Sequence, residues 1–255
     1  MSGTLPTVVY VAGVGHSGST LLDLLLSSHP AVASVGEAAG LRRNPGARCA
    51  CGAPDRSACA FWQKVEQRVR DAVGVPLARL DVLDEGPAFA AHNRALFEAV
   101  AAISGRPVVV DSSKSARRLR GLLSTPGLEV RPVHLLRDPA AVAWSQRRKG
   151  RSSLRSAWHW RRRTAAVRQA LRHRPHVQLH YDALVGNPTS ALARVLAPLG
   201  LQSTRDQLDW AGRERHDLGG NRVRFSRESA IQPDQAWQQA LGPLARALLR
   251  AVAGR

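Results

Sequence analysis

A glycine- and serine-rich turn near the N-terminus has the residue types and spacing of an anion-binding loop. Residues 13–20 read Gly-Val-Gly-His-Ser-Gly-Ser-Thr, between a predicted strand at 8–12 and a predicted helix at 21–26. P-loops have glycine, four residues, glycine, then lysine and Ser or Thr, and their backbone N–H groups and helix N-terminus bind phosphate. We therefore expect a phosphate group to be bound by Gly15, His16, Ser17, Gly18, Ser19 and Thr20.

The lysine of a nucleotide P-loop is missing from this turn, because Ser19 stands in its place. That lysine contacts the β- and γ-phosphates of a nucleoside triphosphate. Its absence favours a ligand with a 5′-phosphate group but no triphosphate tail. A P-loop small-molecule kinase is the competing enzyme hypothesis, since Asp111 at the end of a predicted strand could hold Mg²⁺.

Charged side chains follow three other predicted strands. Glu37 follows the run at 32–35, Lys114 follows the strand at 108–111 after two serines, Arg137 directly follows Leu136, and Ser145 lies eight residues after Arg137. The carboxyl ends of parallel strands meet at one edge of a sheet, where open α/β folds bind their ligands. An arginine there can form a bidentate pair with phosphate, and a glutamate can accept a proton.

Strands and helices alternate along the chain, which predicts an α/β fold: a P-loop-like parallel sheet flanked by helices on both faces. We expect a single domain over residues 1–255, with a Cys/Gly/Pro-rich excursion at about 40–60. The predicted strands are 8–12, 32–35, 108–111, 133–136 and 177–181. The predicted helices are 21–26, 61–73, 87–103, 154–174, 190–199 and 235–252.

The composition is strongly basic, with 37 Lys and Arg against 19 Asp and Glu and a net charge of +18 over 255 residues. A hydrophobic content of 44% is enough for a core and excludes a disordered basic tail. We expect no membrane span, no export signal and a cytoplasmic location. The charge leaves two alternatives open: a basic nucleic-acid-binding protein, or an arginine-rich solvated surface.

The first turn and the segment after strand 133–136 together resemble the sulfotransferases that use 3′-phosphoadenosine 5′-phosphosulfate (PAPS). Residues 17–22 read Ser-Gly-Ser-Thr-Leu-Leu, close to the family's loop for the 5′-phosphosulfate. Residues 135–139 read Leu-Leu-Arg-Asp-Pro and are followed by Ser145, like the family's 3′-phosphate motif. The resemblance implies PAPS as co-substrate, with Arg137 and Ser145 on its 3′-phosphate.

Two further segments resemble this family more loosely. Residues 181–184, Tyr-Asp-Ala-Leu, are similar to a Tyr-Glu-Asp-Leu segment whose tyrosine approaches the adenine in part of the family. An ordinary core tyrosine at a strand end is the alternative for Tyr181. Residues 219–225 resemble a C-terminal loop that closes over the 3′-phosphate, which implies that Asn221 and Arg222 bind the donor.

Three residues are candidates for the chemical step. The context of Glu37 resembles the tyrosylprotein sulfotransferase branch, which implies that Glu37 is the general base. The family usually has Arg or Lys where this chain has His16, so the source of positive charge is open between His16 and Lys114. The implied reaction moves a sulfuryl group from PAPS to an acceptor hydroxyl on a small molecule or glycan: a carbohydrate, lipid, natural product or tyrosine. Under this hypothesis no nucleic-acid partner is expected.

The three cysteines lie in the excursion, at positions 49, 51 and 59. A Cys-x-Cys pair followed by a third cysteine is similar to a metal cluster, but no fourth ligand has convincing spacing. Free thiols or one disulfide are therefore favoured over zinc, and a reducing compartment favours free thiols. The sequence-based expectation is a protein without a metal site.

Overall fold

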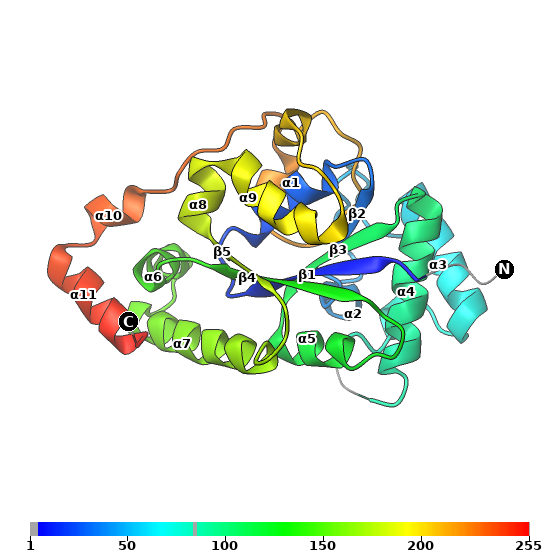
Figure 1. Ribbon diagram of the computed structural model, residues 1–255, viewed down its shortest axis with the longest axis horizontal. Helices are drawn as coiled ribbons and strands as arrows, with labels where there is room; N and C mark the ends of the chain where they lie inside the picture. The colour runs from blue at the N-terminus through cyan, green and yellow to red at the C-terminus, as the bar shows by residue number, and fades with distance from the viewer. Residues whose placement is uncertain (1–4, 84–85, 255) are drawn as a thin grey trace.

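The computed structural model describes residues 5–83 and 86–254, and its centre is a parallel β-sheet (Figure 1). The strand order is β2-β3-β1-β4-β5, and every neighbouring pair is parallel. The strands are β1 (Thr7–Gly13), β2 (Val32–Gly36), β3 (Val108–Lys114), β4 (Val130–Leu136) and β5 (Val177–His180). The predicted parallel α/β fold is confirmed.

The central strand explains why these apolar runs form a sheet covered on both faces. Val8 and Tyr10 of β1 belong to one cluster of buried side chains, and Val9 and Val11 belong to another. Because side chains alternate between the faces of a strand, a strand buried on both faces needs a continuous apolar run. The sequence of β1 has such a run.

Helices cover the two faces separately. Figure 1 shows α1 (Ser19–Ser27), α8 (Tyr181–Gly186) and α9 (Pro188–Leu196) above the sheet, with α5 (Ala116–Leu123) and α7 (Ser153–Ala170) below it. The core cluster on the side of α5 and α7 also takes in α3 and α4. The other helices are α2 (Gly40–Arg43), α3 (Ala60–Val73), α4 (Phe89–Ser104), α6 (Pro139–Arg147), α10 (Ala236–Ala240) and α11 (Pro243–Val252).

The predicted elements differ from the observed ones by a few residues at their ends, and two differences change the kind or number of elements. The predicted strand 177–181 ends at His180, and Tyr181 instead begins α8. The predicted helix 235–252 is two helices, α10 and α11, because Pro243 has no N–H to continue a helix and instead opens a new one. The first difference matters for the site, because the Tyr181 ring lies against Gly18 in the loop after β1.

The strand order places a topological switch point at β1. The chain passes from β1 to one edge of the sheet and then crosses to β4 on the other side of β1. Ligands of open α/β sheets bind outside the carboxyl ends of the strands at such a point. Among the residues described, no helix combines the length and the apolar content needed to span a bilayer.

Candidate active site

A cavity of about 760 Å³ opens at the carboxyl edge of the sheet. It is lined by residues that follow all five strands, and its volume is within the range of small-ligand sites. The sequence-predicted residues that line it are Gly15, His16, Gly18, Ser19, Thr20, Glu37, Lys114, Arg137, Ser145, Tyr181, Asn221 and Arg222. Ser17 is buried in the same loop without lining the cavity.

The loop after β1 is shaped by a left-handed glycine. Gly18 has φ 92° and is the N-cap of α1, and a Cβ at this position would lie 2.6 Å from the Tyr181 ring. Only glycine combines this φ with such a close approach. The Ser17 hydroxyl is buried and has no hydrogen-bond partner among the residues described, although its N–H donates to the Val14 carbonyl at 3.3 Å. The loop therefore retains an unpaired hydroxyl donor.

Arg137, which follows β4, is held by three neighbours. Its Nη1 donates to the His16 carbonyl at 3.0 Å, and its guanidinium lies 4.1 Å from the centre of the Tyr181 ring. Its Nη2 donates to the Asp234 carboxylate at 2.9 Å. Asp234 is separated from Arg137 by 97 residues and belongs to no motif, so this anionic partner could not be predicted from the sequence.

His16 and Ser145 lie together on the same wall of the cavity. The Ser145 Oγ is 3.0 Å from the His16 Nδ1. Burial lowers the pKa of His16, and the nearby cations Lys149 and Arg137 lower it further, so the imidazole is neutral at pH 7. His16 also has φ 69°, a left-handed conformation that is uncommon for a side chain of this size.

Glu37 and Lys114 form an ion pair across the ends of β2 and β3. The Lys114 Nζ donates to the Glu37 Oε1 at 2.6 Å and to the Ser112 carbonyl at 2.9 Å. Lys114 has φ 65°, so both candidate cations of the site stand on left-handed backbone. Such conformations cost energy and cluster at functional sites. The pair brings together two residues that lie 77 positions apart.

The C-terminal loop, which the sequence resemblance assigns to the 3′-phosphate, lies against Glu37 and the loop after β1. The Glu37 N–H donates to the Leu218 carbonyl at 2.8 Å, and the Asn221 N–H donates to the Thr20 hydroxyl at 3.0 Å. Gly36 has φ 67°, and a Cβ there would collide with the Leu218 backbone. Glycine at position 36 is therefore what lets this loop approach Glu37.

Asp111 does not face the cavity. Its side chain is buried, with Oδ2 paired to Arg118 at 2.7 Å and Oδ1 accepting from Ser113. Its carboxylate is thus engaged within the core, which removes the magnesium ligand that kept the kinase hypothesis open. The cavity instead contains Lys149, a cation that the sequence reasoning did not select.

The fold is that of known sulfotransferase domains. The sulfotransferase domain from the Synechococcus PCC 7002 olefin synthase is 18% identical, with a TM-score of 0.64, and the match covers 100% of this chain and 96% of that one. The sulfotransferase domain from the curacin biosynthetic pathway is 16% identical, with a TM-score of 0.60 and coverage of 99% and 98%. A sulfotransferase from Mycobacterium tuberculosis H37Rv is 14% identical, with a TM-score of 0.53 and coverage of 80% and 70%.

The comparison of sequences supports family membership, which the comparison of folds alone does not. None of the curated proteins matches the chain in sequence. A sequence profile described as the sulfotransferase family, however, matches residues 6–206, which is most of the chain. The matched span contains the loop after β1, the Glu37–Lys114 pair and Arg137. The chain therefore belongs to the sulfotransferase family and is a sulfotransferase enzyme.

Proposed function

We propose that this enzyme transfers the sulfuryl group of PAPS to an acceptor hydroxyl, with Glu37 as the general base. The observation that carries the proposal is the convergence of two anion-binding elements on one cavity. The loop at residues 15–20 offers backbone and hydroxyl donors, and Arg137 and Ser145 follow the neighbouring strand β4. Two anion-binding elements on one cavity suit a nucleotide that has phosphate on both sides of its ribose.

The proposed assignments follow from the donor groups. The loop binds the 5′-phosphosulfate through its backbone N–H groups and the Ser19 and Thr20 hydroxyls, and Arg137 and Ser145 bind the 3′-phosphate. The Tyr181 ring packs between Gly18 and the Arg137 guanidinium, and this position at the cavity wall supports a contact with the adenine. Asn221 and Arg222 of the C-terminal loop add an amide and a guanidinium to the lining of the cavity.

The reaction needs one proton transfer and one displacement. The acceptor O–H gives its proton to the Glu37 carboxylate while the acceptor oxygen attacks sulfur in line. The bond between sulfur and the 5′-phosphate oxygen breaks, and adenosine 3′,5′-bisphosphate leaves with that electron pair. Positioning, a base and stabilisation of the developing charge are the three contributions that the protein makes.

Lys114 is the better candidate for stabilising the transferred group. An ammonium has three N–H donors, and Glu37 and the Ser112 carbonyl accept two of them. One N–H is left for a sulfuryl oxygen beside the base. His16 is neutral, because its pKa is lowered by burial and by its cationic neighbours, so it contributes a hydrogen bond rather than a fixed charge.

Several acceptor classes fit this proposal, since each presents a hydroxyl: carbohydrate, lipid, natural product and peptide tyrosine. The Glu37 context similar to the tyrosylprotein branch supports screening tyrosine peptides beside small-molecule and glycan hydroxyls. Polynucleotides are not proposed as substrates, because Lys114, Arg137 and Lys149 line a cavity of nucleotide size.

Calorimetric titration with adenosine 3′,5′-bisphosphate, ADP and ATP tests the donor assignment. We expect the bisphosphate to bind at least about tenfold more tightly than ADP, since one charge-assisted phosphate contact is worth about 1.5–3 kcal/mol. The Arg137→Ala variant should lose this preference, and Arg155→Ala, outside the cavity lining, should keep it. Tighter binding of ATP, or equal binding of all three nucleotides, would refute PAPS as the donor.

A further inference from the structure

Three cysteines and a histidine meet outside the active cavity. The cysteine–histidine cluster consists of Cys49, Cys51, Cys59 and His216, whose donor atoms all lie within 4.8 Å of one another. The three cysteines are free, and two of the sulfur pairs are separated by 3.7 Å, far beyond the length of a disulfide bond. The disulfide considered from the sequence is therefore absent among the described residues.

The distances within this cluster match a tetrahedral zinc site. With Zn–S near 2.3 Å and Zn–N near 2.05 Å, tetrahedral geometry puts two sulfurs about 3.8 Å apart and sulfur about 3.6 Å from nitrogen. The Cys59 Sγ lies 3.7 Å from the Sγ atoms of both Cys49 and Cys51. The His216 Nδ1 lies 3.4 Å from the Cys59 Sγ and 3.9 Å from the Cys49 Sγ. Hydrogen-bonded thiols alone do not require four donors to converge in this way.

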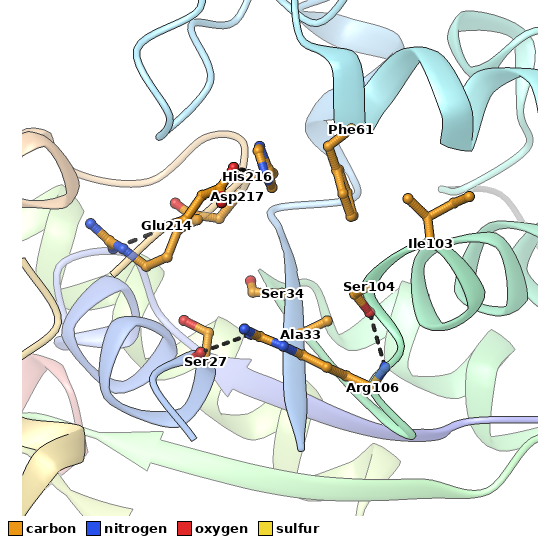
Figure 2. A pocket seen from close by; sticks show the side chains of 11 residues that line it. Ser27, Ala33, Ser34, Phe61, Ile103, Ser104, Arg106, Glu214, His216 and Asp217 are labelled. Atoms are coloured by element: carbon orange, nitrogen blue, oxygen red, sulfur yellow. Dashed lines mark hydrogen bonds and ion pairs between the residues drawn. The ribbon is translucent and has the colours of Figure 1, made fainter. Parts of the chain in front are cut away.

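The surroundings of His216 fix the ring in a ligand orientation. Its Nδ1 faces the sulfurs, while its Nε2 lies 3.2 Å from the Glu214 carboxylate. A carboxylate on the far ring nitrogen is the usual partner of a zinc-bound histidine, because it sets the tautomer. The ring also stacks on Phe61 at 4.5 Å with an interplanar angle of 2°. Figure 2 shows these two rings side by side at one end of a cavity of about 220 Å³.

The backbone around the cluster joins two distant parts of the chain. The Trp62 Nε1 donates to the His216 carbonyl at 2.6 Å, and the Ala50 N–H donates to the Asp217 carbonyl at 3.2 Å. Leu218, two residues after His216, pairs with Gly36 at the end of β2. A metal bound here would fasten the excursion at 40–60 to the segment that borders Glu37.

From this geometry we infer that Cys49, Cys51, Cys59 and His216 bind one zinc ion in a closed, structural site. Three thiolates and one imidazole in tetrahedral arrangement suit zinc, and no position is left open for substrate. The spacing of the cysteines alone could not reveal the site, because its fourth ligand is 157 residues from Cys59. The inference is independent of the sulfuryl donor and of the role of Glu37.

Metal analysis of the purified full-length chain tests the inference without an activity assay. Protein produced in zinc-supplemented medium and kept under reducing conditions should contain about one zinc ion per chain by mass spectrometry. Replacement by Co²⁺ should give the visible absorption of tetrahedral cobalt and a near-ultraviolet thiolate charge-transfer band. Zinc-free protein that takes up neither ion would overturn the inference.

Variants identify the ligands. Cys51 is exposed, so Cys51→Ser should fold and should lower zinc affinity at least about 100-fold, measured by competition with a chelator. Glu214→Gln should weaken affinity about tenfold by removing the partner of the His216 ring. His176→Ala is the matched histidine control, since this exposed side chain lies outside the cluster, and it should keep wild-type affinity. Wild-type zinc affinity in Cys51→Ser would refute the assigned ligands.

Discussion

The active cavity and the cysteine–histidine cluster differ in where along the chain their residues come from. Each strand end supplies the cavity with residues from a short contiguous motif, such as the loop after β1 or Arg137 after β4. The cluster instead takes four donors from positions as far apart as Cys49 and His216. The cavity is open to a ligand, whereas the cluster is closed by mutual contact. Much of the cavity follows from the strand ends, with the C-terminal loop added at its border, while the four donors of the cluster meet only through a long-range crossing of loops.

One segment connects the two regions. His216 belongs to the cluster, Leu218 pairs with Gly36 beside the proposed base, and Asn221 contacts the loop after β1 through Thr20. The predictions below test whether the cavity performs the chemistry while the cluster only supports its border.

Replacing the proposed base should give the largest loss. Glu37→Gln is expected to lower turnover by about 10²–10⁴-fold, the usual contribution of a general base, with unchanged affinity for adenosine 3′,5′-bisphosphate and unchanged zinc content. Single-turnover assays and calorimetry measure the two effects. Glu129→Gln, on an exposed carboxylate, serves as control. Wild-type turnover in Glu37→Gln would remove the base assignment.

The two candidate cations of the cavity should differ in their effect on the chemical step. Lys114→Ala is expected to lower the single-turnover rate by about 10²-fold, since it removes a fixed charge beside the reacting group. His16→Ala should cost about tenfold, because the neutral imidazole offers only a hydrogen bond. A larger loss in His16→Ala than in Lys114→Ala would reverse the proposed roles.

Loss of zinc should affect stability more than chemistry. Cys51→Ser is expected to lower the midpoint of thermal unfolding by several degrees and to reduce turnover by less than about tenfold, because the Leu218 contact with Gly36 also holds the border segment. Calorimetric scans and turnover assays with and without a chelator measure this. A turnover loss as large as that of Glu37→Gln would mean that the two regions are one functional unit.

Removing the anion that pairs with Arg137 should strengthen nucleotide binding. The Asp234 carboxylate accepts from the Arg137 Nη2 at 2.9 Å and so competes with a phosphate for this guanidinium. Asp234→Ala is expected to tighten adenosine 3′,5′-bisphosphate binding several-fold, by about 1 kcal/mol. Asp182→Ala, on an acidic side chain outside the cavity lining, is the calorimetric control. Weaker binding in Asp234→Ala would show that the carboxylate organises the site.

A buried carboxyl between the two regions should make stability depend on pH. Burial raises the pKa of Asp23 to about 7, and the Asp217 carboxylate contributes, while the Ser112 hydroxyl opposes the shift. The folded state therefore holds a proton that the unfolded state loses above about pH 4, so this group lowers stability as pH rises toward 7. Asp23→Asn should flatten that decline and gain about 4 kcal/mol at pH 8 relative to pH 4, since each unit of pKa shift corresponds to about 1.4 kcal/mol.

Denaturant unfolding of Asp23→Asn and of the wild-type protein across pH 4–8 checks this prediction. Asp71→Asn, on an exposed helix position, is the control for loss of a carboxylate. An unchanged pH profile in Asp23→Asn would show that the carboxyl is ionised in the folded protein throughout this range.

Much of the active cavity could be predicted, because each of its parts is local. An apolar run predicts a buried strand, and the residue after it must lie at the carboxyl edge of a parallel sheet. This reasoning, together with the resemblance to PAPS-dependent sulfotransferases, selected Glu37, Lys114 and Arg137, all of which line the cavity. It left Asp111 open as a magnesium ligand of the kinase alternative, but Arg118 pairs with this carboxylate in the core.

The fold class, and the motifs that put phosphate-binding and acidic side chains at strand ends, could be predicted from the amino-acid sequence. The pairing of side chains depends on how the chain packs: Lys114 meets Glu37, Arg137 meets Asp234, and His216 meets the three cysteines. The physical reason is the distance along the chain between the residues that interact. Strand burial and turn geometry are set by residues within a few positions of one another, whereas ion pairs and metal ligand sets depend on how separate loops cross after the core has packed.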